Sequence, residues 1–156
     1  MRWTVAFFLV AFWGAGWSAG PAATEEKKSA RLEQLYDQES NPRKRIKPAM
    51  ELTAERLSEL RAAYDAEDTG KRGEAVEACL SALGRLETAV TAAAHAGSSK
   101  NVEVHLRRQA RDLESLKTSV SYLDRPAIEK VLARVVALRE QILYSIMNPP
   151  ERSRKK

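Results

Sequence analysis

Four successive segments of this chain repeat the same spacing, alternately three and four positions, and this repeat constrains the fold more than any other feature. In an α-helix such spacing brings the repeated positions onto one face, which can be buried against other helices. We refer to these positions as the seam of each segment. The seams are Ile46, Met50, Thr53, Leu57, Leu60 and Tyr64; Val76, Cys79, Leu83, Leu86, Val90 and Ala93; Val102, Leu106, Gln109, Leu113, Leu116, Val120 and Leu123; and Ile128, Val131, Val135, Leu138 and Ile142.

Capping residues stand where helices are expected to start. Asn41 precedes Pro42, a pair typical of an N-cap followed by proline in the first turn. Ser99 or Asn101 is expected to cap the third helix, and Asp124 the fourth. The predicted helices span about 42–67, 72–96, 101–123 and 126–147.

Glycine and proline mark the expected interruptions. The first and second helices are predicted to be separated at Asp68, Thr69, Gly70 and Gly73. The second and third are predicted to be separated at Gly97, Ser98 and Ser99. Pro48 lies inside the first pattern, so that helix is expected either to kink at Pro48 or to begin near it.

Connections this short favour antiparallel neighbours. The sequence therefore predicts an all-α protein in which residues 42–148 form an up-down antiparallel four-helix bundle. Residues 23–41 are expected to be a charged linker or a short helical arm, with Leu32, Leu35 and Tyr36 as its apolar face. This arm is expected either to cover one end of the bundle or to remain loose.

The N-terminus differs in composition from the rest of the chain. All Trp and Phe residues lie in the first 17 residues, where an apolar run follows Arg2. The run from Trp3 to Trp17 has the length of the apolar core of a signal peptide and is short for a membrane span, which takes roughly 20 residues. Residues 1–22 are therefore predicted to be a signal peptide cleaved after Ala22, and the protein to be periplasmic or extracellular. The alternative is an uncleaved signal that anchors the protein in a membrane.

The charges of the remaining chain are unevenly distributed. The sequence has 26 Lys and Arg and 21 Asp and Glu, so removal of Arg2 leaves 25 bases against 21 acids. Residues 149–156 are predicted to be a basic disordered tail. This tail is expected either to be a solubilising frayed end or to contact an anionic membrane, an anionic polymer or an acidic partner. Nucleic acid is not expected as a partner, because no aromatic platform stands beside the bases. The basic residues of the tail are Arg152, Arg154, Lys155 and Lys156.

We find no catalytic constellation and no cofactor motif, and we therefore predict a protein that is not an enzyme. His95 and His105, with Glu103 nearby, flank the second interhelical turn and are weak candidates for metal ligands. Their spacing matches no established metal motif. Cys79 is the sole cysteine and lies on a seam, so it is expected to be a small core residue.

The third predicted helix carries Arg107, Arg108 and Arg111 opposite its seam. Glu103 and Asp112 are spaced for ion pairs with Arg107 and Arg108. This face is therefore either a solvated, ion-paired surface or a surface that contacts an anion or a partner. Gln109 falls on the seam, where it is expected to form a polar layer unless Ala110 takes its place.

The stretch Ala63-Tyr64-Asp65-Ala66, followed by Gly73-Glu74-Ala75-Val76, Leu80 and Ala82-Leu83, resembles a tetratricopeptide hairpin. This family implies peptide or protein binding. The resemblance covers about 20 residues, and no second copy follows at the family's period.

The leading functional expectation is an exported binding or structural protein of the periplasm or cell envelope. It would bind a protein partner through a helical face. The alternatives are a metal or small-ligand carrier and a membrane-tethered envelope protein. A homo-oligomer also fits, because seams of this kind close equally well within one chain or between chains.

Overall fold

The computed structural model describes residues 21–66, 68–93 and 99–148, with side chains from residue 27 onward. These residues form five α-helices and no strand, which confirms the predicted all-α class. The helices are α1 (Pro21–Gln38), α2 (Pro42–Asp65), α3 (Thr69–Ala92), α4 (Ser99–Ser119) and α5 (Arg125–Met147).

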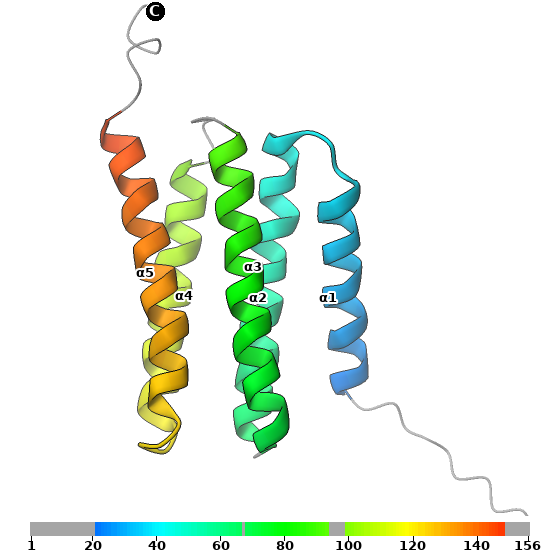
Figure 1. Cartoon of the computed structure of the whole chain (residues 1–156), viewed down its shortest axis with the longest axis vertical. Coiled ribbons are helices and arrows are strands. Elements are labelled where there is room, and N and C mark those ends of the chain that lie inside the picture. Colours follow the sequence, from blue (N-terminus) through cyan, green and yellow to red (C-terminus); the bar gives the residue numbers. More distant parts are fainter. Residues whose placement is uncertain (1–20, 67, 94–98, 149–156) are drawn as a thin grey trace, which may run out of the picture.

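The helices run up and down beside one another (Figure 1). The closest pairs are α2 with α3 and α4 with α5, each joined by a short connection. Helix α3 also contacts α5, and α2 contacts α4. Two antiparallel hairpins therefore face each other across a shared core.

The N-terminal arm differs from both expectations. It is an 18-residue helix, α1, that lies lengthwise against α2 instead of covering an end or standing free (Figure 1). Leu32 and Tyr36 are buried, as predicted, but Leu35 is 47 % exposed. Ser29 is buried in its place, because positions 29, 32 and 36 share one helical face. Leu32 packs with Leu52 of α2 and Ala82 of α3.

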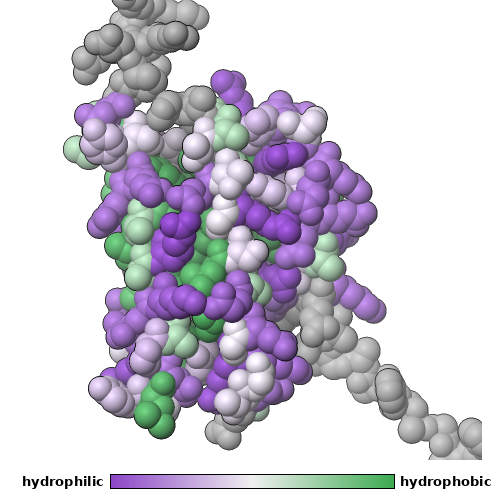
Figure 2. Space-filling view, in the orientation of Figure 1, coloured by the Kyte–Doolittle hydropathy of each residue, from purple (hydrophilic) through white to green (hydrophobic). Residues whose placement is uncertain are grey.

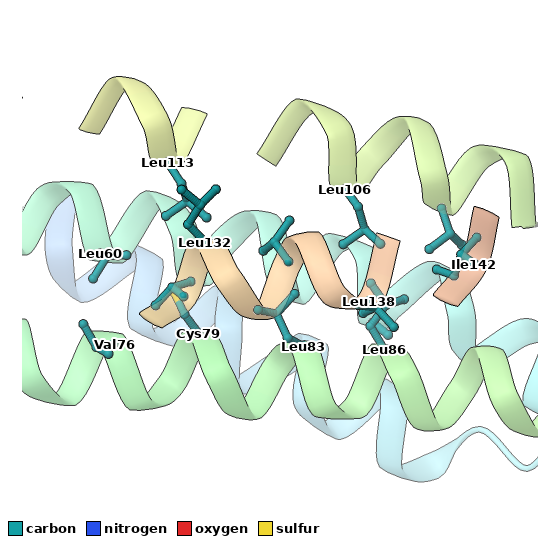
Figure 3. Packing of buried hydrophobic residues seen from close by; sticks show 14 of the residues in the cluster. Leu60, Val76, Cys79, Leu83, Leu86, Leu106, Leu113, Leu132, Leu138 and Ile142 are labelled. Atoms are coloured by element: carbon teal, nitrogen blue, oxygen red, sulfur yellow. The ribbon is translucent and has the colours of Figure 1, made fainter. Parts of the chain in front are cut away.

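The seam side chains meet in one apolar cluster (Figure 3). Leu86 and Leu106 are fully buried, and Cys79 is buried among the leucines, as predicted. Leu123 is the exception, because α4 ends at Ser119 and leaves this side chain 87 % exposed. The labelled residues of this cluster are Leu60, Val76, Cys79, Leu83, Leu86, Leu106, Leu113, Leu132, Leu138 and Ile142.

Three of the predicted helix starts can be compared with the structure. The Asn41 side chain accepts a hydrogen bond from the backbone N–H of Arg43 (3.0 Å), so this cap is confirmed. Helix α2 begins at Pro42 and continues through Pro48. Asp124 is the N-cap residue of α5, as predicted, but its side chain makes no capping bond. Its carboxylate instead accepts a hydrogen bond from Ser121 and pairs with Arg72.

The predicted interruption is correct at Asp68, which lies between α2 and α3, but wrong at Thr69, Gly70 and Gly73. Helix α3 starts at Thr69 and includes both glycines. The side chain of Asp68 accepts a hydrogen bond from the backbone N–H of Lys71 (3.1 Å) and so caps this helix. A cap outside the glycines thus determines where the helix begins. Helix α4 begins at Ser99 and contains Asn101, and the expected break at Gly97 lies outside the described residues.

The surface is mostly hydrophilic. On the face formed by α3 and α5, polar side chains dominate, and apolar side chains are visible between the two helices (Figure 2). None of the helices in the described ranges has the length and apolar content to span a bilayer.

Candidate functional site

The candidate binding surface is a basic stripe along the outer face of α4. Its core is the set Arg107, Arg108 and Arg111 predicted from the sequence. The structure adds Lys100 and Val104, because residues spaced by three, four and seven positions share a helical face. All five side chains are exposed. We use the name basic stripe for Lys100, Val104, Arg107, Arg108 and Arg111.

Two arginines of the basic stripe lack acidic partners. Arg107 Nη2 lies 3.8 Å from a carboxylate oxygen of Glu103, as the sequence predicts. The predicted pair between Arg108 and Asp112 does not form, and Arg111 has no salt bridge to any described residue either. Only one of the two predicted ion pairs of this face is therefore present.

Several arginines of the other described helices are paired with acidic residues of neighbouring segments. Arg56 bridges to Glu33 at 2.8 Å, and Arg72 bridges to Asp124 at 3.3 Å. Arg139 donates from Nε to Glu103 of α4 at 2.8 Å. These pairs link neighbouring helices, whereas Arg108 and Arg111 of α4 form no salt bridge with another described residue.

Val104 gives the basic stripe an apolar centre. Its side chain is 52 % exposed, and along the helical face it follows Lys100 and precedes the three arginines. Val104 was not predicted as a site residue, because it lies off the seam. Its signal was an isolated β-branched residue within an otherwise charged face. An apolar centre with a charged rim is the usual anatomy of a protein interface, in which Arg is enriched.

His105 lies beside the basic stripe and contacts α2. Its Nε2 lies 2.8 Å from Thr53 Oγ1, which in turn donates to the carbonyl oxygen of Met50 at 2.8 Å. A hydroxyl has one hydrogen, so both bonds form when Nε2 carries a hydrogen and donates to Thr53. Burial lowers the pKa of His105, and the positive charge of Arg108 lowers it further.

We expect His105 to make the protein less stable in mild acid. A lowered pKa means that the folded state prefers neutral imidazole, whereas the unfolded chain takes up a proton near pH 6.5. The stabilising contribution of neutral His105 to the free energy of unfolding is therefore complete above about pH 6.5 and is lost as the pH falls below this value. Denaturant unfolding of the protein and of His105→Gln, measured across this range, tests the expectation. Equal pH slopes for both proteins would contradict it.

The three candidate metal ligands are not brought together where they are described. Glu103 is engaged by Arg139 of α5, whereas His105 faces Thr53 of α2. His95 lies outside the described residues, so a site that includes it stays a prediction. Among residues 21–66, 68–93 and 99–148, no three His, Cys, Asp or Glu side chains gather as metal ligands.

Polar side chains also meet in the core. Gln109 is buried, as the seam predicts, and its Nε2 has no hydrogen-bond partner in the described chain. Thr53 and Cys79 line the same small cavity, of about 10 Å³, which matches one water molecule and no larger ligand. Burial raises the pKa of Cys79 to about 12, so its thiol stays protonated and unreactive at neutral pH.

Arg152, Arg154, Lys155 and Lys156 lie outside the described residues. Comparisons with protein families, with curated proteins and with solved structures found no match to this chain. The function of the basic stripe is therefore inferred from its own geometry and charge.

Proposed function

We propose that this chain is an exported helical binding protein of the periplasm or cell envelope. In this proposal residues 1–22 are a cleaved signal, and α2–α5 form a four-helix bundle to which α1 is added as a fifth helix. The basic stripe of α4 is the binding surface. Its partner is an acidic helical segment of another envelope protein, and no catalysis is involved.

The observation that carries the proposal is that exposed arginines without acidic partners among the described residues share one helical face with an exposed valine. Arg108 and Arg111 have no acidic partner among the described residues, and Val104 is exposed one turn before Arg108 on the same face. An amphipathic helix with an apolar residue over Val104 and flanking carboxylates would complement this surface. Because the bases stand on a helix and not on a loop, little ordering is needed on binding.

A photoreactive amino acid at position 104, introduced in living cells, tests this proposal. We expect one reproducible protein adduct whose cross-linked peptide is acidic. Arg108→Glu combined with Arg111→Glu should weaken the interaction by about tenfold or more, since interface arginines often dominate binding. Reversal of the acidic residues in the cross-linked peptide to lysine should restore the adduct in that double variant.

The matched controls lie on other parts of the surface. The photoreactive group at the exposed position Ala133 of α5 should not give the same adduct. Lys117→Glu with Lys130→Glu makes the same change in net charge away from the basic stripe and should leave the adduct intact. Loss of the adduct in this control, or no adduct at position 104, would refute the proposal.

A further inference from the structure

One end of the helical domain combines basic side chains with exposed apolar ones. At this end α2 and α4 begin and α5 ends (Figure 1). We propose that this end rests on the surface of an anionic lipid bilayer, with its bases among the headgroups and its apolar side chains at the acyl boundary. We name it the basic end and define it by Arg43, Lys44, Lys47, Lys100, Tyr144 and Met147.

The bases of this end have little local neutralisation. Arg43 and Lys44 lie in the first turn of α2, and Lys100 lies in the first turn of α4. All three are exposed and form no salt bridge with another described residue. The Lys47 ammonium is 4.0 Å from Glu51 on a side chain that is 85 % exposed.

These positions are unfavourable for the helices themselves. The unpaired N–H groups at a helix start already carry partial positive charge, so bases there are repelled. No acidic residue offsets them in the first turn of α2 or α4. The bases therefore do not serve helix stability, and an external anionic surface would relieve their repulsion.

Apolar side chains at the same end select a membrane over a soluble polyanion. Tyr144 and Met147 lie three residues apart on the last turns of α5 and are 71 % and 77 % exposed. Tyrosine suits the boundary of a bilayer, because its ring is apolar and its hydroxyl is polar. A soluble polyanion would neutralise the bases but leave both of these side chains in water.

The sequence beyond α5 adds to this charge. The chain continues from Asn148 at the basic end, and its last residues include Arg152, Arg154, Lys155 and Lys156. Bases near an anionic bilayer contribute electrostatic attraction, and durable peripheral binding generally combines such charge with apolar contact. Both contributions are found at this end.

The opposite end differs in charge. There Lys71 pairs with Asp68, Arg72 pairs with Asp124, and the guanidinium of Arg125 lies over the ring of Tyr122. Tyr122 and Leu123 are exposed at this end, where Lys71 and Arg72 are paired with acids. Helix α1 also begins at this opposite end, at Pro21 (Figure 1).

Co-sedimentation with lipid vesicles tests the inference. The protein is purified as cells produce it, and its N-terminus is defined by intact mass. We expect it to bind phosphatidylcholine vesicles that contain phosphatidylglycerol, to bind pure phosphatidylcholine far less, and to dissociate as salt is added. Arg43→Gln, Lys44→Gln and Lys47→Gln together should weaken binding on the order of 100-fold, at about fivefold for each base. Tyr144→Ser with Met147→Ser should weaken it by about tenfold.

Two control variants carry the same changes at or near the opposite end. Lys71→Gln, Lys117→Gln and Lys130→Gln together remove equal charge, and Tyr122→Ser with Leu123→Ser removes equal apolar exposure. Both should bind vesicles like the unchanged protein. Equal binding to neutral and anionic vesicles, or loss of binding in either control, would overturn the inference. So would capture by inorganic polyphosphate that is as strong as vesicle binding and indifferent to Tyr144 and Met147.

Discussion

Leu32→Ala is expected to lower the free energy of unfolding by about 2–4 kcal/mol. Leu32 is 6 % exposed and fills the space between Leu52 and Ala82, so its truncation leaves a cavity under α1. Chemical denaturation measures the loss. Hydrogen exchange should show that the amides of α1 lose protection first, because this helix contacts the rest of the domain along one side only.

Leu35→Ala is the matched control for this prediction. It removes the same atoms from the same helix, but Leu35 is 47 % exposed and lies off the buried face. Its effect should stay within about 0.5 kcal/mol. Similar losses for the two variants, or no loss for either, would mean that α1 does not pack as described.

The packing of α1 against the other helices could not be predicted from the sequence. Leu32 and Tyr36 were recognisable as apolar positions. Two large apolar side chains, however, do not predict how strongly the segment packs against the other helices. Much of the contact is polar and long-range. Tyr36 donates its hydroxyl hydrogen to the carbonyl oxygen of Arg85 at 3.0 Å, and Asp37 pairs with Arg85 at 3.1 Å. Such partners lie almost 50 positions apart, and no local spacing predicts them.

The seams were predictable because they depend on helical geometry alone. Every residue between Ile46 and Ile142 that the structure buries in the main cluster lies on or beside a predicted seam, as Leu86 and Leu106 illustrate. Helix ends were less predictable, because several residues near each end were plausible caps. At the start of α3 the cap is Asp68, although Gly70 and Gly73 indicated a later start. At α5 the carboxylate of Asp124 accepts a hydrogen bond from nearby Ser121 and pairs with Arg72 of α3, and no local motif encodes the pair with Arg72.

The same limit applies to the basic stripe. The sequence placed Arg107, Arg108 and Arg111 on one polar face and offered acids at suitable spacing. Whether those acids are free depends on the neighbouring helices. Glu103 is shared between Arg107 and Arg139, whereas Asp112 forms no salt bridge with Arg108. The charge left on the surface is therefore a property of the assembled helices.

Gln109 is the polar residue of the core whose replacement by an apolar residue is expected to stabilise the fold most. Its side chain is 5 % exposed, and its Nε2 has no hydrogen-bond partner among the described residues. A buried donor left in this state is destabilising by about 1–3 kcal/mol. A buried polar residue on a helical seam can compensate by specifying one register of the helices, as single polar core residues do in coiled coils.

We therefore expect Gln109→Leu to raise the free energy of unfolding by about 1–2 kcal/mol, because the unpaired amide is replaced by an apolar side chain of similar size. Gln141→Leu makes the same change at an exposed position of α5 and should alter stability by less than about 0.5 kcal/mol. Denaturant unfolding compares the two variants, and sedimentation shows whether Gln109→Leu remains in the oligomeric state of the unchanged protein. A stabilised variant that populates additional oligomers would assign Gln109 a role in specifying the packing of the helices. A variant less stable than the unchanged protein would show that the amide is satisfied in solution and would refute this account of the core.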